Sequence, residues 1–127
     1  MAIVNFVGGV FLFAKNPEAL ANWYRDFLGI ETENFNGTYY HEFLYRHHDN
    51  PKREGRMTWS IMPAKDQPTE QKTAQMNYQV DDLDAFLQQL EESGIKIEGR
   101  ADEDYGKFAW ISDPEGNRIE LFEDKEF

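Results

Sequence analysis

The sequence predicts an α+β fold made of two tandem βαβββ modules, whose curved mixed sheets form a cleft. A strand pattern, a helix cap, an amphipathic helix and a glycine stop follow one another over residues 11–30, and the same order returns over residues 77–95. Each copy is followed by three further strand patterns. Such repetition marks a repeated structural unit, and the cleft between two units is a natural place for a small-molecule site. We expect a single domain over residues 1–127.

The first module is expected to span about residues 1–64. Residues 4–14 are rich in Val and Phe, which predicts a buried strand. Asn16 is a favourable N-cap and Pro17 suits the first helical position, so a helix is expected to begin there. Apolar residues recur on one helical face up to Gly29, which is expected to end the helix.

Three strands are expected to complete this module. Asn36-Gly37 is a hairpin turn signal between the first two of them. A polar loop that contains Pro51 precedes the third, and residues 65–73, which have no apolar period, are expected to link the modules. The strands are predicted at residues 31–36, 38–46 and 57–62.

The second module is expected to span about residues 74–127. Its first strand, which begins near Gln75, alternates polar and apolar side chains. Asp82 is the expected cap of a helix that Gly94 ends. Residues 113–116 carry Asp first, Pro second and Gly fourth, which is typical of a type I turn. The remaining strands are predicted at residues 95–99, 106–112 and 118–123.

Composition narrows the expected partners and compartment. The 127 residues include 24 acids against 13 lysines and arginines, for a net charge of −11. This charge repels phosphate backbones and anionic headgroups, so we expect neither nucleic acid nor membrane as a partner. The apolar start of the chain is too short to span a bilayer. There is no cysteine, which excludes disulfides and thiolate chemistry and fits a reducing cytoplasm, where we expect the protein.

Three motifs, met in order along the chain, carry a family resemblance: Asn16-Pro17 with Trp23-Tyr24-Arg25-Asp26-Phe27-Leu28-Gly29, then Val80-Asp81-Asp82-Leu83-Asp84, then Asp113-Pro114-Glu115-Gly116-Asn117-Arg118-Ile119-Glu120-Leu121. Together they resemble the vicinal oxygen chelate superfamily of glyoxalases, extradiol dioxygenases, fosfomycin-resistance enzymes and bleomycin-resistance proteins. The resemblance covers nearly the whole chain. It implies the glyoxalase-like fold, a homodimer and, in the family's enzymes, one divalent metal ion that chelates two adjacent substrate oxygens.

Carried over one by one, the family's metal ligands are mostly missing from this sequence. The two first-strand histidines fall on Gly9 and Gln75, and the first module's late-strand carboxylate falls near Trp59. Only the final carboxylate is kept, as Glu120. Because a divalent ion normally needs three or more protein donors, we expect no cofactor and no metal at the usual site. A metal site relocated to His41 and Glu120 is the less favoured alternative.

The residues predicted to line the cleft combine aromatic rings, amides and one carboxylate. Strand parity places Ile119 and Leu121 under a helix and turns Glu120 to the other face. Glu120 is the candidate general acid or base, with a framework role as its alternative. The two amides could equally pair with each other, and the tryptophans could equally belong to the core. The expected ligand-binding residues are Phe11, Trp59, Gln75, Asn77, Phe108 and Trp110.

The sequence leaves two classes of function open for a small-molecule-binding member of this superfamily. In the first, a glyoxalase-like lyase acts on a small carbonyl or oxygenated metabolite, with Glu120 as the proton shuttle. In the second, the protein sequesters a planar ligand without catalysis, similar to the bleomycin-resistance proteins. A metal-dependent lyase or dioxygenase with a relocated metal site is a further alternative.

Overall fold

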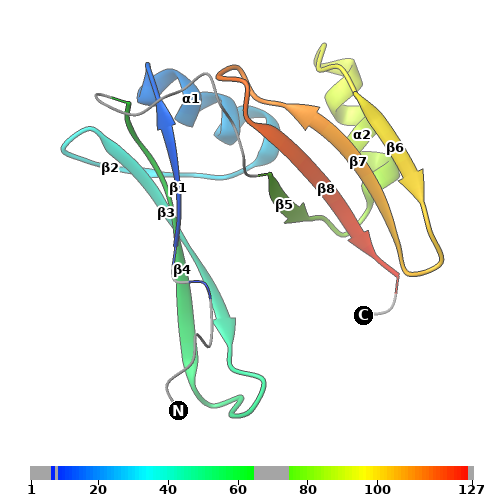
Figure 1. Cartoon of the computed structure of the whole chain (residues 1–127), viewed down its shortest axis with the longest axis horizontal. Coiled ribbons are helices and arrows are strands. Elements are labelled where there is room, and N and C mark those ends of the chain that lie inside the picture. Colours follow the sequence, from blue (N-terminus) through cyan, green and yellow to red (C-terminus); the bar gives the residue numbers. More distant parts are fainter. Residues whose placement is uncertain (1–6, 8, 65–74, 126–127) are drawn as a thin grey trace. The chain divides into compact units, whose positions relative to one another are not determined.

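The computed structural model describes residue 7 and residues 9–64 and 75–125 (Figure 1). The chain divides into two compact units, Met1–Thr69 and Glu70–Phe127, which are described in turn. The boundary falls inside the segment 65–73 that the sequence assigns to a linker. That segment, and residues 4–6 and 8 of the first predicted strand, lie outside the described residues.

The first unit contains a four-stranded mixed sheet and one helical segment. The strand order is β1-β4-β3-β2, with β1 parallel to β4 and the other neighbours antiparallel. The elements are β1 (Gly9–Ala14), α1 (Pro17–Trp23), the π-helical turn η1 (Tyr24–Leu28), β2 (Glu33–Phe35), β3 (Thr38–Arg46) and β4 (Glu54–Pro63).

The second unit repeats this arrangement. The strand order is β5-β8-β7-β6, again with only the first pair parallel. The elements are β5 (Met76–Gln79), α2 (Leu83–Glu92), β6 (Gly99–Asp102), β7 (Gly106–Ser112) and β8 (Arg118–Asp124). Each unit is therefore βαβββ, which confirms the predicted fold class.

The predicted helix signals act as expected. The side chain of Asn16 accepts a hydrogen bond from the backbone N–H of Ala19, and Asp82 caps α2 in the same way, both at 3.1 Å. Gly29 and Gly94 adopt φ angles of 74° and 84°, a left-handed conformation that favours glycine. The chain thus leaves each helix at the glycine that the sequence marks.

Each helix covers one face of its own sheet. In the first unit, Leu20 and Tyr24 are buried together with Ile61 and Leu12. In the second unit, α2 contributes buried leucines at 83, 87 and 90, and the sheet contributes Ala109, Ile111, Ile119 and Leu121, all of which are buried. Each fully buried Leu or Ile contributes about 1.5–3 kcal/mol, so each of these layers stabilises its own unit.

The starts of two strands differ most from the prediction. Residues 95–98 form no strand, and β6 begins only at Gly99. The reason is that Ile95 still belongs to the end of α2, because its N–H donates to the carbonyl of Leu90 at 3.0 Å. Strand β4 begins at Glu54, three residues before the predicted start, because the hairpin keeps its pairing through polar residues. Among the described residues, no helix combines the length and the hydropathy needed to cross a bilayer.

Candidate functional site

The strand register shows which side chains share the face of the second sheet that is turned away from α2. Paired residues of neighbouring strands point to the same side. Asn77 lies beside Glu120, and Trp110 lies beside it on the other neighbouring strand. Phe108 and Phe122 form the next pair along the sheet. We name this surface the aromatic–acid face: Asn77, Phe108, Trp110, Glu120 and Phe122.

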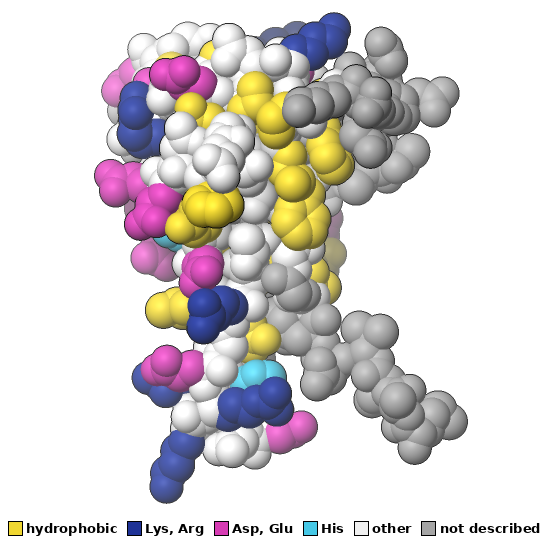
Figure 2. Space-filling view, turned by 90° about the vertical axis from the view of Figure 1, so that its left-hand side faces the viewer, with side chains coloured by type: hydrophobic (Ala, Val, Ile, Leu, Met, Phe, Trp, Pro, Cys, Tyr) yellow, Lys and Arg dark blue, Asp and Glu magenta, His cyan; other side chains and the backbone are white. Residues whose placement is uncertain are grey.

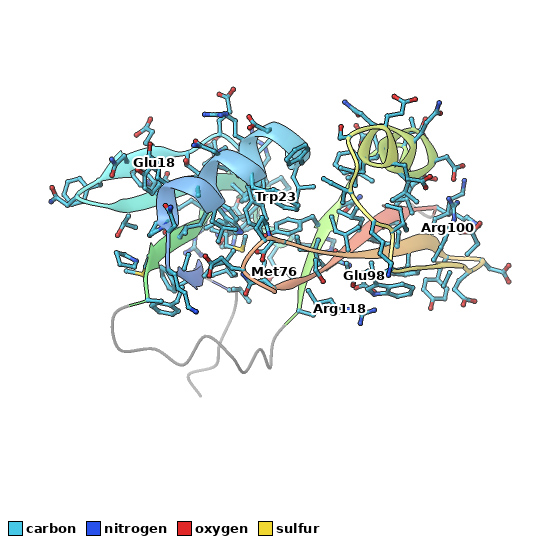
Figure 3. The ribbon with its side chains drawn as sticks, turned by 90° about the horizontal axis from the view of Figure 1, so that it is seen from above. Glu18, Trp23, Met76, Glu98, Arg100 and Arg118 are labelled. Atoms are coloured by element: carbon cyan, nitrogen blue, oxygen red, sulfur yellow. The ribbon has the colours of Figure 1, made fainter. Side chains whose placement is uncertain are left out.

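The helix-covered face confirms this orientation. Ile119 and Leu121, which flank Glu120 along β8, are buried on the side of α2, as predicted. Figure 3 shows Arg118, two residues before Glu120, on the side of the sheet opposite α2. Strand alternation therefore turns Glu120 away from the core, and its side chain is only half-buried.

One oxygen of Glu120 is engaged within the face. The Nδ2 atom of Asn77 donates a hydrogen bond to Glu120 Oε2 at 2.9 Å. Within the described part of the chain, Glu120 Oε1 accepts no hydrogen bond, and neither Gln75 nor Arg118 contacts the carboxylate in this way. Among the described residues, Asn77 is thus the hydrogen-bond partner of Glu120, and no hydrogen bond joins Gln75 to Asn77 there.

Aromatic rings lie on the sheet beside this pair. Phe108 and Phe122 stack with centroids 5.0 Å apart and planes 22° apart. Trp110 lies over Gly99, where an added Cβ would come within 3.2 Å of the indole. The ring of Phe122 covers Gly106 in a similar way. Because glycine leaves room for a ring to lie down on the strand, the face presents flat aromatic surface next to a carboxylate.

Phe122 belongs to this face and Tyr105 lies beside it, although neither stands among the residues predicted to bind a ligand. The ring of Tyr105 meets Phe108 edge-on at 5.8 Å and is 53% exposed. Phe122 shares strand parity with Glu120, which is the sequence signal that identifies it. Tyr105 precedes β7, so no periodicity could have placed it.

Trp59 does not take the position predicted for it. Its side chain is completely buried, and its ring lies 4.9 Å from that of Tyr24 in an edge-to-face contact. Tyr24 belongs to the helical segment that covers the first sheet. Trp59 is therefore a core residue on the helix-covered face, in line with the alternative that the sequence left open.

The register gives the reason for this error. In the first sheet Phe11 lies beside Ser60, just as Asn77 lies beside Glu120 in the second sheet. Ser60, rather than Trp59, is therefore the first-module counterpart of Glu120. A shift of one residue along a strand exchanges its two faces, so the approximate placement near Trp59 selected the wrong side.

The remaining predicted ligand-binding residues are Phe11 in the first unit and Gln75 in the second. Phe11 lies on the face of the first sheet turned away from α1 and is 52% exposed. Its ring lies over Gly9, where an added Cβ would be 3.1 Å from Phe11 Cζ. Gln75 is exposed and immediately precedes β5. The cleft between the two modules stays a prediction.

These residues do not fit a divalent metal ion. Gly9 offers no donor, Gln75 offers an amide, and Ser60 offers a neutral hydroxyl where a carboxylate would be needed. The relocated alternative also finds no support, because the Nδ1 atom of His41 is hydrogen-bonded to the carbonyl of Glu31 at 2.8 Å on the helix-covered face. Among residues 7, 9–64 and 75–125, no group of three or more His, Asp and Glu side chains is placed to hold a metal.

Comparison with known families shows the superfamily of this chain. A model of the Glyoxalase/Bleomycin resistance protein/Dioxygenase superfamily matches residues 4–121. The chain belongs to this superfamily. No curated protein sequence matches it.

Solved structures of other proteins share its fold. Lactoylglutathione lyase from Agrobacterium tumefaciens is 19% identical over 94% of both chains, with a TM-score of 0.69. TnmS3, an antibiotic binding protein from Streptomyces sp. CB03234, is 19% identical over 98% of this chain and 100% of its own, with a TM-score of 0.67. The bleomycin resistance determinant encoded on the transposon Tn5 is 16% identical over 95% of this chain and 99% of its own, also with a TM-score of 0.67.

Proposed function

We propose that this superfamily member binds a small planar molecule on the aromatic–acid face, without a metal ion of its own. The observation that carries the proposal is the position of Glu120, which keeps Oε1 available beside the flat rings of that face while Asn77 holds Oε2. Aromatic side chains combined with a few well-placed polar groups are the usual lining of small-molecule sites. The ligand class is therefore an aromatic or conjugated compound.

The charge of the site further defines this ligand. A carboxylate with an available oxygen accepts hydrogen bonds and attracts cations, and aromatic ring faces also attract cations. The net charge of −11 favours the approach of cations over anions. A planar ligand that carries an N–H donor or a positive charge fits these properties best. Two structural relatives are named as antibiotic-binding or bleomycin-resistance proteins, which supports sequestration as the role.

A second candidate function is acid–base catalysis on a small carbonyl compound. The available Oε1 atom of Glu120 favours it, because a proton shuttle needs an oxygen that no other residue occupies. The variant Glu120→Gln separates the two functions. If a substrate is found, catalysis by Glu120 requires loss of turnover in this variant at saturating substrate, whereas sequestration requires only weaker binding.

Tryptophan fluorescence tests the binding function directly. A cationic acridine dye and an anionic naphthalenesulfonate of similar size serve as planar probes. We expect saturable quenching by the cationic dye, and about tenfold weaker binding in Glu120→Gln, the value of one charge-assisted hydrogen bond. Trp110→Phe should lose most of the quenching, whereas Trp23→Phe, which removes an indole from α1, should keep it. Quenching that never saturates for either dye would contradict the proposal.

Metal content provides an independent measurement. Elemental analysis of the purified protein should find less than stoichiometric zinc, nickel, manganese and iron, because the donor set is incomplete. A stoichiometric ion that survives dialysis would contradict the metal-free proposal and favour a metal-assisted reaction.

We infer that the protein forms a homodimer, as the family resemblance implies. Phe11, Phe35 and Leu44 are 52%, 69% and 73% exposed, and all three lie on the face of the first sheet turned away from α1. Exposed apolar side chains gathered on one face are typical of an interaction surface. Sedimentation should show a dimer that Leu44→Glu weakens, and a monomer in the unaltered protein would exclude this assembly. Cytoplasmic location stays a prediction.

A further inference from the structure

The tip of the β3–β4 hairpin differs in charge from the rest of the chain. Residues 46–56 hold four of the 13 lysines and arginines and two of the three histidines, but only two of the 24 acids. Figure 2 shows these basic side chains at the lower end of the view, where the hairpin of Figure 1 ends. Like charges gathered in one short loop repel each other, and a bound anion would relieve that repulsion.

The loop has a defined shape because its backbone is closed by three hydrogen bonds. The N–H of His47 donates to the carbonyl of Arg53 at 3.1 Å, which closes the hairpin. Within the loop, Asn50 N–H donates to His47 and Arg53 N–H donates to Asn50, at 3.2 and 2.9 Å. Pro51 fixes its own φ angle between these turns. The loop is therefore arranged before any ligand arrives, which lowers the entropic cost of binding.

A hollow of about 360 Å³ lies at this tip, within the size range of small-ligand sites. Tyr45, residues 46–50 and Arg53 line it. The guanidinium of Arg46 already has partners within the hairpin. Its Nη1 atom donates to the Pro51 carbonyl at 3.2 Å, and its Nη2 atom forms an ion pair with Glu54 Oε1 at 3.6 Å. Arg53 makes no side-chain hydrogen bond or ion pair with any described residue, so its guanidinium can serve a ligand.

We propose that this hollow binds a small anion through a phosphate or carboxylate group. Arg53 provides a planar fork of N–H donors that matches either group. The rings of His47 and His48 add N–H donors in either neutral tautomer. Asp49 is the acid in the lining and opposes an anion, so its removal should strengthen binding.

Amide chemical shifts of the full chain, followed during titration with inorganic phosphate at constant ionic strength, test the proposal. We expect saturable shifts confined to residues 46–53, and about tenfold weaker binding in Arg53→Gln. Asp49→Asn should bind about threefold more tightly. Lys52→Gln is the matched control, since it removes the same charge from the neighbouring position but Lys52 does not line the hollow; its affinity should change less than about twofold.

A parallel titration with acetate distinguishes the two anion classes. Tighter binding of phosphate assigns the site to phosphate-bearing ligands, and equal or tighter binding of acetate assigns it to carboxylates; both support an anion site. If neither titration saturates, or if Lys52→Gln weakens binding as much as Arg53→Gln, the charge of the loop attracts an adventitious ion only and the proposal is overturned. The dye-binding variants do not involve this loop, so the two proposals can fail separately.

Discussion

The two tryptophans that the sequence could not separate should respond to substitution in opposite ways. Trp59 is fully buried against Tyr24, whereas Trp110 is half-buried on the aromatic–acid face. Replacing a buried aromatic side chain by alanine costs about 3–5 kcal/mol, which is a large part of the about 5–15 kcal/mol of a typical domain. Trp110→Ala should cost less, about 1–2.5 kcal/mol, because part of its side chain is already exposed to solvent.

Urea unfolding followed by far-ultraviolet circular dichroism measures both effects. With a slope of about 2 kcal/mol per molar urea, Trp59→Ala should lower the midpoint by about 1.5–2.5 M and Trp110→Ala by about 0.5–1.25 M. If Trp59→Ala does not fold, Trp59→Phe should still cost about 1–2 kcal/mol while the folded protein binds the cationic dye normally. A larger loss of stability in Trp110→Ala than in Trp59→Ala would refute the assignment of Trp59 to the core, as would loss of dye binding in folded Trp59→Phe.

Three further predictions concern charged and buried polar groups. Hydrogen bonds from Lys107 and Arg100 lower the pKa of Asp84 below its ordinary 3.8. The stabilising contribution of Asp84 is therefore complete above pH 3.8 and is lost as the pH falls through the lowered pKa. Urea midpoints measured at about pH 6 and about pH 3 should differ less in Asp84→Asn than in the unaltered protein. The hydrogen bond to Glu33 raises the pKa of Tyr40, and Glu33→Gln should move it back toward 10.0 in a spectroscopic titration of tyrosinate, with an unmoved titration contradicting the pairing. Asp113 accepts hydrogen bonds from two backbone N–H groups and one side-chain amide at a buried turn. Asp113→Ala removes this acceptor, so the free energy of unfolding should fall by about 2–4 kcal/mol. A change below about 0.5 kcal/mol would contradict the role of Asp113 in holding the turn.

The second module could be predicted from the sequence because its strands have two chemically different faces. Ile119 and Leu121 alternate with Glu120, and Ala109 and Ile111 alternate with Trp110. A period of two residues assigns such side chains to one face or the other without any tertiary information. The orientation of the candidate site residues on these strands therefore follows from the pattern of their neighbours.

The first module could not be oriented in this way because β4 lacks alternation. Trp59, Ser60 and Ile61 are all buried, so three successive residues give no sign of which face each occupies. Only pairing fixes the faces, since Phe11 lies beside Ser60. The hydrogen bond between Asn77 and Glu120 was likewise one of several possible pairings, because sequence separation does not reveal which of two amides lies beside the carboxylate.

The two modules share a backbone plan but not the chemistry of their equivalent positions. The pair formed by Asn77 and Glu120 in the second sheet corresponds to Phe11 and Ser60 in the first. An apolar ring and a small hydroxyl thus occupy the positions where the second module places an amide and a carboxylate. Folding requires only that the helix-covered faces remain apolar, so the opposite faces are free to differ. Different side chains on the open faces are therefore compatible with an intact fold, and the chemistry of each sheet must be inferred from its own side chains.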